Sequence, residues 1–333
     1  MVTTRVIAAA AVSARGRRWR SVARDGAAHD LDGGPPPRAR KMMTRGALLA
    51  ALGLRDLAAA LDRPLHDAGF FLGVGASAGP MEDVVPMLAA SIGDDGFSLA
   101  RFGRAGLAAC NPLLAFQLMN NFTLCHAAIQ EGVGGPSGAF FSRGGGTATA
   151  LVEARAAIAA GDCAVAIAGG ADSALHPVTW AELVRDGFAA GGLVAGEGCA
   201  LVALAADGAP GLAVVESCAL HHAGDGDTAR LADVARGVVA AWATARDEAA
   251  AVVIAPWGEP PRRALRAAIE EAVGRAVVID VSTTAGDALA ASPALAWVAA
   301  VDRICAGLAS RVLVLGAGVD GDLGVAAFAR EAS

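Results

Sequence analysis

The chain has 333 residues, of which 55% are hydrophobic and 5% aromatic, and it contains no tyrosine. Lys41 is its only lysine, so chemistry that needs a lysine amine as a Schiff base or a general base has almost no candidate. The formal net charge of -6 argues against a nucleic-acid-binding protein, which needs a basic surface.

Continuous apolar strands alternate with helices along the whole chain. In the first half we expect strands at 6–12, 69–75, 139–142, 163–168 and 199–205, and helices at 42–61, 113–131, 147–160 and 179–186. In the second half we expect strands at 212–217, 252–254, 277–281, 311–315 and 324–329, and helices at 228–245, 261–273 and 293–308. Such strands belong in sheets that are covered by helices on both faces. We therefore predict an α/β fold with two pseudo-duplicated halves, residues 1–207 and 208–333.

No stretch of the sequence predicts a membrane span. The longest apolar run, 288–301, contains Pro293 and is shorter than the roughly 20 residues that a spanning helix needs. The apolar run at 6–12 is short for a signal peptide, and the arginine cluster at 15–24 after it indicates either an exposed loop or a docking surface for an acidic partner. The six cysteines lack the spacing of a metal site. We expect a cytoplasmic protein that uses neither a metal nor a cofactor.

Two glycine motifs follow predicted strands. Residues 316–321 (GAGVDG) match G-x-G-x-x-G, but too few residues follow for the helix, strand and acidic residue of a dinucleotide site, so we do not expect NAD binding. Residues 75–79 (GASAG) match the G-x-S-x-G nucleophile elbow around Ser77. Asp172 with His221 or His222 would complete a triad, although Pro80 follows the elbow directly. A serine hydrolase is therefore an alternative function.

The most informative segment is 135–200. It reads GPSGAFFSRGGG from residue 135, GDCAVAIAGGADSAL from residue 161 and GEGCA from residue 196. This ordered series resembles the nucleophile region of the β-ketoacyl synthases, where a GPS-type turn, a strand, the nucleophile elbow, a helix, a G-(D/E)-C-x-x-A-(I/L)-A-G-G segment and GEG-A follow one another. The resemblance implies a thiolase-like fold with mixed sheets.

The same spacing places the catalytic positions of that family on residues that cannot perform its chemistry. The nucleophilic cysteine falls on Gly144, which has no side chain to acylate. The two histidines fall on Pro256 and Asp287, and the lysine that precedes the second one falls on Ser282. These groups stabilise negative charge in the family, which an aspartate would repel. The resemblance therefore implies a chain without condensing activity of its own.

Residues 169–177 (GGADSALHP), with Trp180 just after them, resemble the GGVDSALxPxxW segment of chain length factors. These are the partner subunits of type II polyketide ketosynthases, and they usually carry glutamine in a QAGG context where this chain has Arg143 and Gly144. The resemblance implies a heterodimer with an intact ketosynthase, served by an acyl carrier protein, in polyketide or polyene biosynthesis. This subunit would cap the acyl tunnel.

In that family, the residues that limit product length lie on the helix before the GP turn, here the predicted helix 113–131. Phe116, Met119 and Thr123 would share one face of this helix at the spacing i, i+3, i+7. They would line the tunnel or, alternatively, simply pack in the core. A scaffold that binds acyl groups or acyl carrier protein is the other function that stays open, beside the hydrolase using Ser77.

Overall fold

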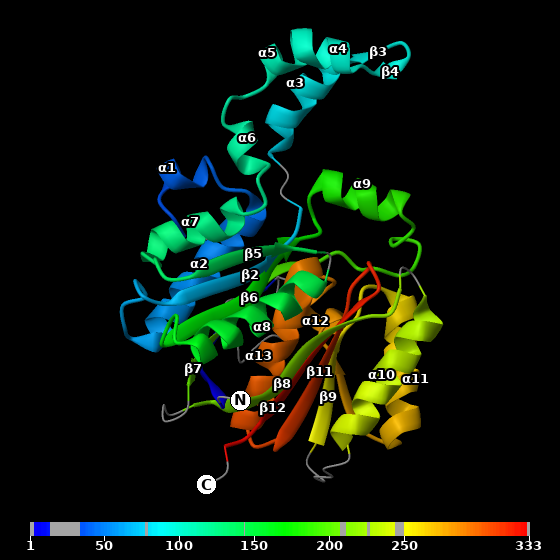
Figure 1. The fold of residues 1–333 in the computed structure, drawn as a ribbon. Coiled ribbons are helices and arrows are strands. Elements are labelled where there is room, and N and C mark those ends of the chain that lie inside the picture. Colours follow the sequence, from blue (N-terminus) through cyan, green and yellow to red (C-terminus); the bar gives the residue numbers. More distant parts are fainter. Residues whose placement is uncertain are drawn as a thin grey trace.

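The computed structural model describes residues 3–13, 34–76, 79–142, 144–206, 211–224, 227–243 and 250–331. The arginine cluster at 15–24, Ser77, Arg143 and the predicted boundary at 207–208 lie outside these residues. A mixed ten-stranded sheet forms the centre of the molecule, as Figure 1 shows. Within the described part of the chain, no helix is both long enough and apolar enough to cross a membrane.

The two halves of the sheet have the same strand order. The first half contains β1 (Thr4–Ser13), β2 (Gly69–Val74), β5 (Ser137–Phe141), β6 (Val165–Ser173) and β7 (Glu197–Ala206). The second half contains β8 (Ala213–His222), β9 (Ala250–Ala255), β10 (Val277–Asp280), β11 (Arg311–Ala317) and β12 (Asp322–Ala329). The orders β5-β2-β6-β7-β1 and β10-β9-β11-β12-β8 are equivalent, and β1 and β8 pair antiparallel where the halves meet. The predicted duplicated α/β fold is confirmed, with one continuous sheet.

Helices cover the sheet in three groups, each above its own cluster of buried side chains. The outer helices of the first half are α2 (Arg45–Leu61) and α7 (Phe122–Glu131), and those of the second half are α10 (Thr228–Ala243) and α11 (Glu259–Val273). Figure 1 shows α8 (Gly145–Ala160) and α13 (Ser292–Cys305) between them. Small side chains allow close approach: a Cβ on Gly73 of β2 would overlap the backbone of Thr147 on α8.

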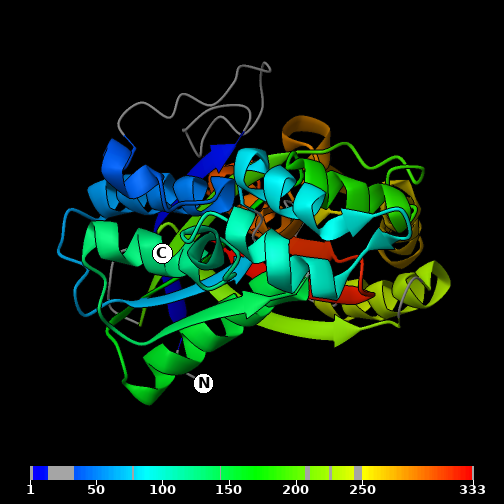
Figure 2. The ribbon, with the colours of Figure 1, turned by 90° about the horizontal axis from the view of Figure 1, so that it is seen from above.

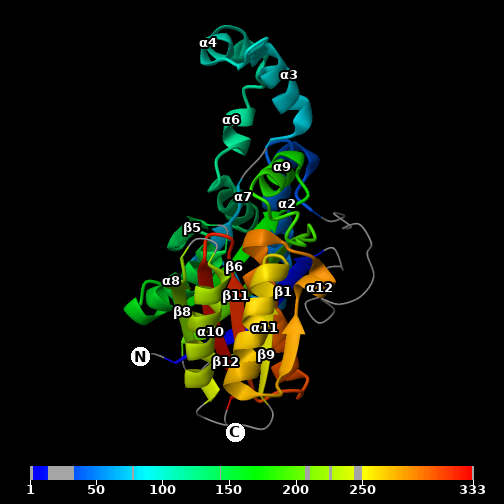
Figure 3. The ribbon, with the colours of Figure 1, turned by 90° about the vertical axis from the view of Figure 1, so that its right-hand side faces the viewer.

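Between β2 and β5 the chain leaves the body as a projecting segment, residues 81–117, which we call the arm. Its elements are α3 (Met81–Ser91), β3 (Ile92–Gly93), β4 (Gly96–Phe97), α4 (Leu99–Arg101), a π-helical turn (Phe102–Gly106), α5 (Leu107–Ala109) and α6 (Leu114–Gln117). Figures 1 and 3 show the arm standing away from the sheet, and Figure 2 shows it from above. The sequence patterns did not predict the arm.

Four short elements complete the described structure. They are α1 (Pro37–Arg40), α9 (Pro177–Arg185), α12 (Ser282–Ala285) and a 3-10 turn (Leu289–Ala291). Helix α9 lies at the same end of the molecule as the arm (Figure 1). Helix α12 and the 3-10 turn follow β10; Ser282 is the first residue of α12, and Asp287 lies between the two elements.

One predicted element is wrong in a way that bears on function. The expected single helix 113–131 is two helices, α6 and α7, separated by residues 118–121. The break contains Asn120 and Asn121, and asparagine side chains compete with helical backbone hydrogen bonds. The amides of Phe122 and Thr123 bond three residues back, to Met119 and Asn120 (3.0 and 3.2 Å), as in a turn.

Candidate functional site

Gly144 lies immediately before the first residue of α8. Its φ of 155° and ψ of -47° form a conformation that only glycine adopts readily. A Cβ at this position would overlap the Cα of Gly318 and lie 3.1 Å from the Gly318 nitrogen. The position that the resemblance assigns to the nucleophile is therefore occupied by backbone from the loop between β11 and β12. Neither a cysteine nor a glutamine side chain fits there as the chain is folded.

Pro256 follows β9 and is buried, so the first histidine position holds a side chain that cannot transfer a proton. Trp257, next to it, is 2% exposed and packs in an apolar cluster with Leu183 and Leu289. Among the described residues, nothing accepts a hydrogen bond from its indole nitrogen. Sequence reasoning missed Trp257, although a tryptophan beside a vacated catalytic position is a signal that the space has been filled.

Asp287 is fully buried and acts as a structural link. Its Oδ2 accepts a hydrogen bond from the Val194 amide at 2.9 Å. Its backbone N–H donates to the Val194 carbonyl (2.7 Å), and its carbonyl accepts from the Gly196 amide (3.1 Å). These bonds join the turn after α12 to the segment that enters β7. Burial raises the pKa of Asp287 to about 6, and its Oδ1 has no hydrogen-bond partner among the described residues.

Asp287→Asn tests this reading of the carboxyl. Because its pKa rises from 3.8 to about 6 on folding, the carboxyl destabilises the protein progressively from pH 4 to pH 6, by about 3 kcal/mol above that range. Asparagine keeps the acceptor for Val194 and carries no charge. We expect the free energy of unfolding of the variant, relative to wild type, to rise by about that amount between pH 4 and pH 7.5 in urea titrations. A difference that is independent of pH would contradict the assignment.

Ser282, at the lysine position, belongs to a closed ionic network. Its Oγ donates to Asp280 Oδ1 (2.6 Å) and accepts from Arg262 Nη2 (2.7 Å). Arg262 also donates from Nε to Asp280 Oδ2 (2.7 Å) and from Nη1 to Glu259 Oε2 (2.8 Å). The cation of this region is thus an arginine from α11, held by carboxylates rather than presented to a substrate. Sequence reasoning missed Arg262, because it lies outside the motifs of the family.

Asp172 and Glu197, which belong to the motifs at 169–177 and 196–200, also hold backbone and side chains together. Asp172 is buried and accepts from the amides of Ser173 (2.7 Å) and Ala290 (3.2 Å), and burial raises its pKa to about 7. The hydroxyl of Thr147 on α8 donates to the carbonyl of the same Ala290. Glu197 accepts two hydrogen bonds from Arg45 (2.6 and 2.9 Å) and one from the Ser173 hydroxyl (2.9 Å). The turn at 286–291 is therefore clamped by the first half of the molecule.

These contacts leave the hydrolase alternative without support. Both oxygens of Asp172 accept backbone hydrogen bonds, and His222 instead faces Asp322, with Nδ1 3.1 Å from Oδ1. Ser77 lies outside the described residues. No side-chain contact that we describe brings the three members of that triad together.

The three predicted tunnel residues do not share a helix face. Phe116 lies on α6 and is 42% exposed, Met119 lies in the break and is 48% exposed, and Thr123 lies on α7 and is 4% exposed. The ring of Phe116 packs edge-on against Phe122, with 5.7 Å between centroids. The expected common stripe is therefore wrong. A role for the exposed pair in a tunnel stays a prediction, which needs a partner to form the opposite wall.

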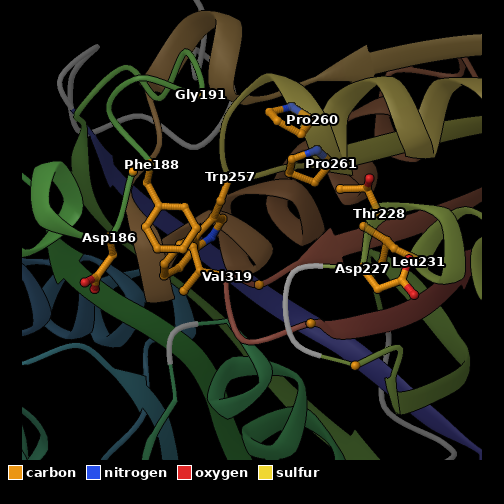
Figure 4. Close-up of a pocket in the computed structure, with 14 residues that line it drawn as sticks. Asp186, Phe188, Gly191, Asp227, Thr228, Leu231, Trp257, Pro260, Pro261 and Val319 are labelled. Carbon is orange, nitrogen blue, oxygen red and sulfur yellow. The ribbon is translucent and has the colours of Figure 1, made fainter.

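A cavity of about 230 Å³ lies beside the Pro256 position. Figure 4 shows its wall of Phe188, Trp257 and Val319 facing Leu231 and the first residues of α10. The remaining lining comes mainly from prolines and glycines, with Asp186, Asp227 and Thr228 as its polar members. Within the described ranges, no group of three histidine, cysteine, aspartate or glutamate side chains is placed to hold a metal ion.

The vacated positions gather at one place because of the sheet topology. Strands β9, β10 and β11 are parallel, so Pro256, Ser282 and the loop after β11 emerge from the same edge. That loop contacts Gly144, which brings the start of α8 to this edge as well. Pro256, Ser282, the loop after β11 and the start of α8 therefore lie at one edge of the sheet.

No protein-family model matches the sequence, and no curated protein matches it either. Solved structures do match the fold over nearly the whole chain. One is a type II polyketide synthase acyl-carrier protein in complex with its ketosynthase (TM-score 0.78, 13% identity, 99% of this chain and 100% of the other). The chain has the ketosynthase fold.

Two further structures support that statement. The ishigamide ketosynthase/chain length factor is 16% identical, with a TM-score of 0.72 over 99% of this chain and 100% of the other. A β-ketoacyl synthase from Burkholderia phymatum STM815 is 15% identical, with a TM-score of 0.76 over 100% of both chains. The ketosynthase-like, thiolase-like fold expected from the resemblance at residues 135–204 is confirmed.

Proposed function

We propose that the chain is a non-catalytic, chain-length-factor-type subunit that pairs with an active ketosynthase in type II polyketide or polyene biosynthesis. The observation that carries this proposal is the combination of an intact fold with an elbow that has no room for a side chain at Gly144. Pro256, Asp287 and Ser282 remove the groups that would stabilise an enolate. A fold kept intact without its chemistry favours a role in assembly.

The surface around the arm supports pairing with another subunit. Large apolar side chains on the arm are at least one-third exposed, namely Val85, Leu88, Ile92, Phe97, Leu99, Leu107, Leu113 and Phe116. Val178, Trp180 and Val184 of α9 add to them at the same end of the molecule. Monomeric proteins rarely expose contiguous apolar surface on this scale. Strand β5, at the edge of the sheet, has an unpaired backbone row that a second chain would also cover.

The matched structures favour the same kind of partner. One of them contains a ketosynthase with its acyl-carrier protein, and another is a ketosynthase/chain length factor. We propose that an intact ketosynthase forms a heterodimer with this chain and that acyl carrier protein serves the complex. Co-expression with a ketosynthase encoded beside it, followed by affinity purification and light scattering, tests the proposal. We expect a 1:1 complex, and a stable monomer that ignores such partners would refute it.

Phe116→Ala tests whether the exposed residues at the base of the arm shape the product. Phe116 lies where a partner would close a channel against α6, and alanine removes its ring without disturbing the buried Thr123. We expect the reconstituted complex to release products that are longer by one or more extension units, measured by mass spectrometry. Val184→Ala on α9 is the control, for which product length should stay the same. Unchanged products for Phe116→Ala would show that the ring only packs in the interface.

The cavity favours a second candidate function, a scaffold that binds acyl groups by itself. Its apolar lining and its volume of about 230 Å³ suit a short acyl chain. Titration of the isolated chain with a short acyl thioester, followed by calorimetry, separates the two candidates. Saturable binding that Leu231→Trp removes supports the scaffold. If the titration gives only the heat of dilution, and the chain forms a stable complex with the ketosynthase, the result supports the partner subunit.

A further inference from the structure

The loop between β11 and β12, residues 318–321, carries the glycine motif that matched a dinucleotide site. The strands on either side of it pair antiparallel, so it is a hairpin turn rather than a strand-to-helix turn. The Gly318 amide donates to the Asp322 carbonyl (2.8 Å), and the Gly321 amide donates to the Gly318 carbonyl (3.3 Å). The Gly321 carbonyl also accepts from the Ala223 amide (2.8 Å), which ties the turn to the end of β8.

Asp322 connects this turn to the vacated elbow. The Ser142 hydroxyl donates to Asp322 Oδ2 (3.2 Å) and accepts from the amide of Gly145, the first residue of α8 (3.2 Å). Asp322 Oδ1 faces Nδ1 of His222 at 3.1 Å. A single carboxylate therefore joins the end of β5, the start of α8 and the end of β8.

Two packing contacts hold the turn against the elbow from above and below. Gly318 lies on Gly144 so closely that a side chain at residue 144 would overlap its Cα. Val319 packs against the apolar cluster that contains Trp257 and Leu289. On its other side the turn forms part of the cavity wall through Gly318, Val319 and Gly321. The turn thus separates the cavity from Gly144.

We propose that the turn at 318–321 is a permanent seal over the vacated nucleophile position, closed by backbone-to-backbone packing and fastened by Asp322. The cavity is then a blind pocket, and any ligand in it meets Val319 instead of the elbow. The inference deepens the proposed function, since a non-catalytic subunit has no use for an open elbow. It is tested on the isolated chain, so its failure would leave the pairing with a ketosynthase standing.

Gly144→Ala compared with Gly274→Ala tests the packing. Gly144 precedes α8 and Gly274 follows α11, and both have a positive φ outside the left-handed helical region (φ 155°, ψ -47° and φ 69°, ψ -128°), but a Cβ at Gly274 would meet nothing within 4 Å. Backbone strain therefore arises in both variants, and the contact with Gly318 is particular to one. We expect Gly144→Ala to lower the melting temperature by at least twice as many degrees as Gly274→Ala. Equal losses would overturn the seal.

Hydrogen exchange tests the same inference if Gly144→Ala fails to fold. In the wild-type chain we expect the amides of Gly318 and Gly321 to exchange at least a hundredfold more slowly than unstructured amides. Asp322→Ala removes the fastening and should speed both amides at least tenfold. Asp233→Ala, on the exposed face of α10, is the control and should leave them unchanged. Fast exchange of Gly318 and Gly321 in the wild type would show a mobile turn and would refute the seal.

Discussion

We expect the double substitution Leu99→Glu/Leu107→Glu to abolish co-purification with the ketosynthase while leaving the isolated chain folded. Both leucines lie on the arm and are 77% and 56% exposed, so they make few contacts within this chain. Each leucine that a partner buries contributes about 1.5–3 kcal/mol, and burying an unpaired carboxylate costs more. A combined loss of at least about 5 kcal/mol weakens binding by more than about a thousandfold.

Leu308→Glu is the matched control for this experiment. Leu308 is 61% exposed and lies between α13 and β11, away from the arm. The same leucine-to-glutamate change there should leave the amount of complex unchanged in size-exclusion chromatography with light scattering. Circular dichroism of each purified variant checks the fold. A complex that survives the arm substitutions would place the interface elsewhere and would remove the main structural support for pairing.

Arg262→Ala should be among the most destabilising single substitutions in the protein. Its guanidinium donates to Asp280, Ser282 and Glu259, and the Asp280 carboxylate is 2% exposed. Breaking a buried ion pair typically costs about 3–5 kcal/mol, and Arg266, whose Nη2 lies 4.0 Å from Asp280 Oδ2, compensates only part of the charge, so the loss should lie towards the lower end of that range. We expect a loss of about that size in the free energy of unfolding, measured by urea titration at pH 7.5.

Two further variants show whether the loss comes from the buried charge. Arg263→Ala removes a neighbouring arginine of α11 that is 73% exposed, and it should change the free energy of unfolding by less than about 1 kcal/mol. Arg262→Ala combined with Asp280→Asn should recover part of the loss, because the uncompensated charge is gone. If Arg262→Ala and Arg263→Ala lowered the free energy of unfolding equally little, Arg262 would not stabilise a buried carboxylate. The role that we assign to the network around Ser282 would then be wrong.

The sequence predicted the elements that pack on the sheet, because their apolar pattern is a direct consequence of burial. Strands such as β6 and β7 are apolar on both faces, and the helices between them are rich in alanine, so their periodicity identifies them. The motif spacing also singled out Gly144, Pro256 and Ser282, which the topology brings to one edge of the sheet. Positions within a contiguous motif can be assigned by counting residues, because the same short segment occupies the same place in the fold.

Features that depend on contacts between distant segments were beyond the sequence. Apart from α3, the arm consists of elements of two to five residues, and few of its side chains are buried, so no periodicity reveals it. In the sequence, residues 113–131 have the pattern of one continuous amphipathic helix. Only the structure shows that the backbone turns at Asn120 and Asn121. Arg262 contacts Ser282, and Trp257 follows Pro256 directly. Their roles depend on partners that are distant in the sequence, so only the structure shows them.

The contact between Gly144 and Gly318 has a consequence for the evolutionary history of the chain. Restoring a cysteine at residue 144 alone would force its Cβ into the backbone of the neighbouring turn, so the first step back towards an enzyme would cost stability and gain no activity. Rebuilding the turn alone would open the interior and again gain nothing. Residue 144 and the turn at 318–321 would therefore have to change together before a side chain could occupy this position, so no single substitution at either place leads towards an enzyme.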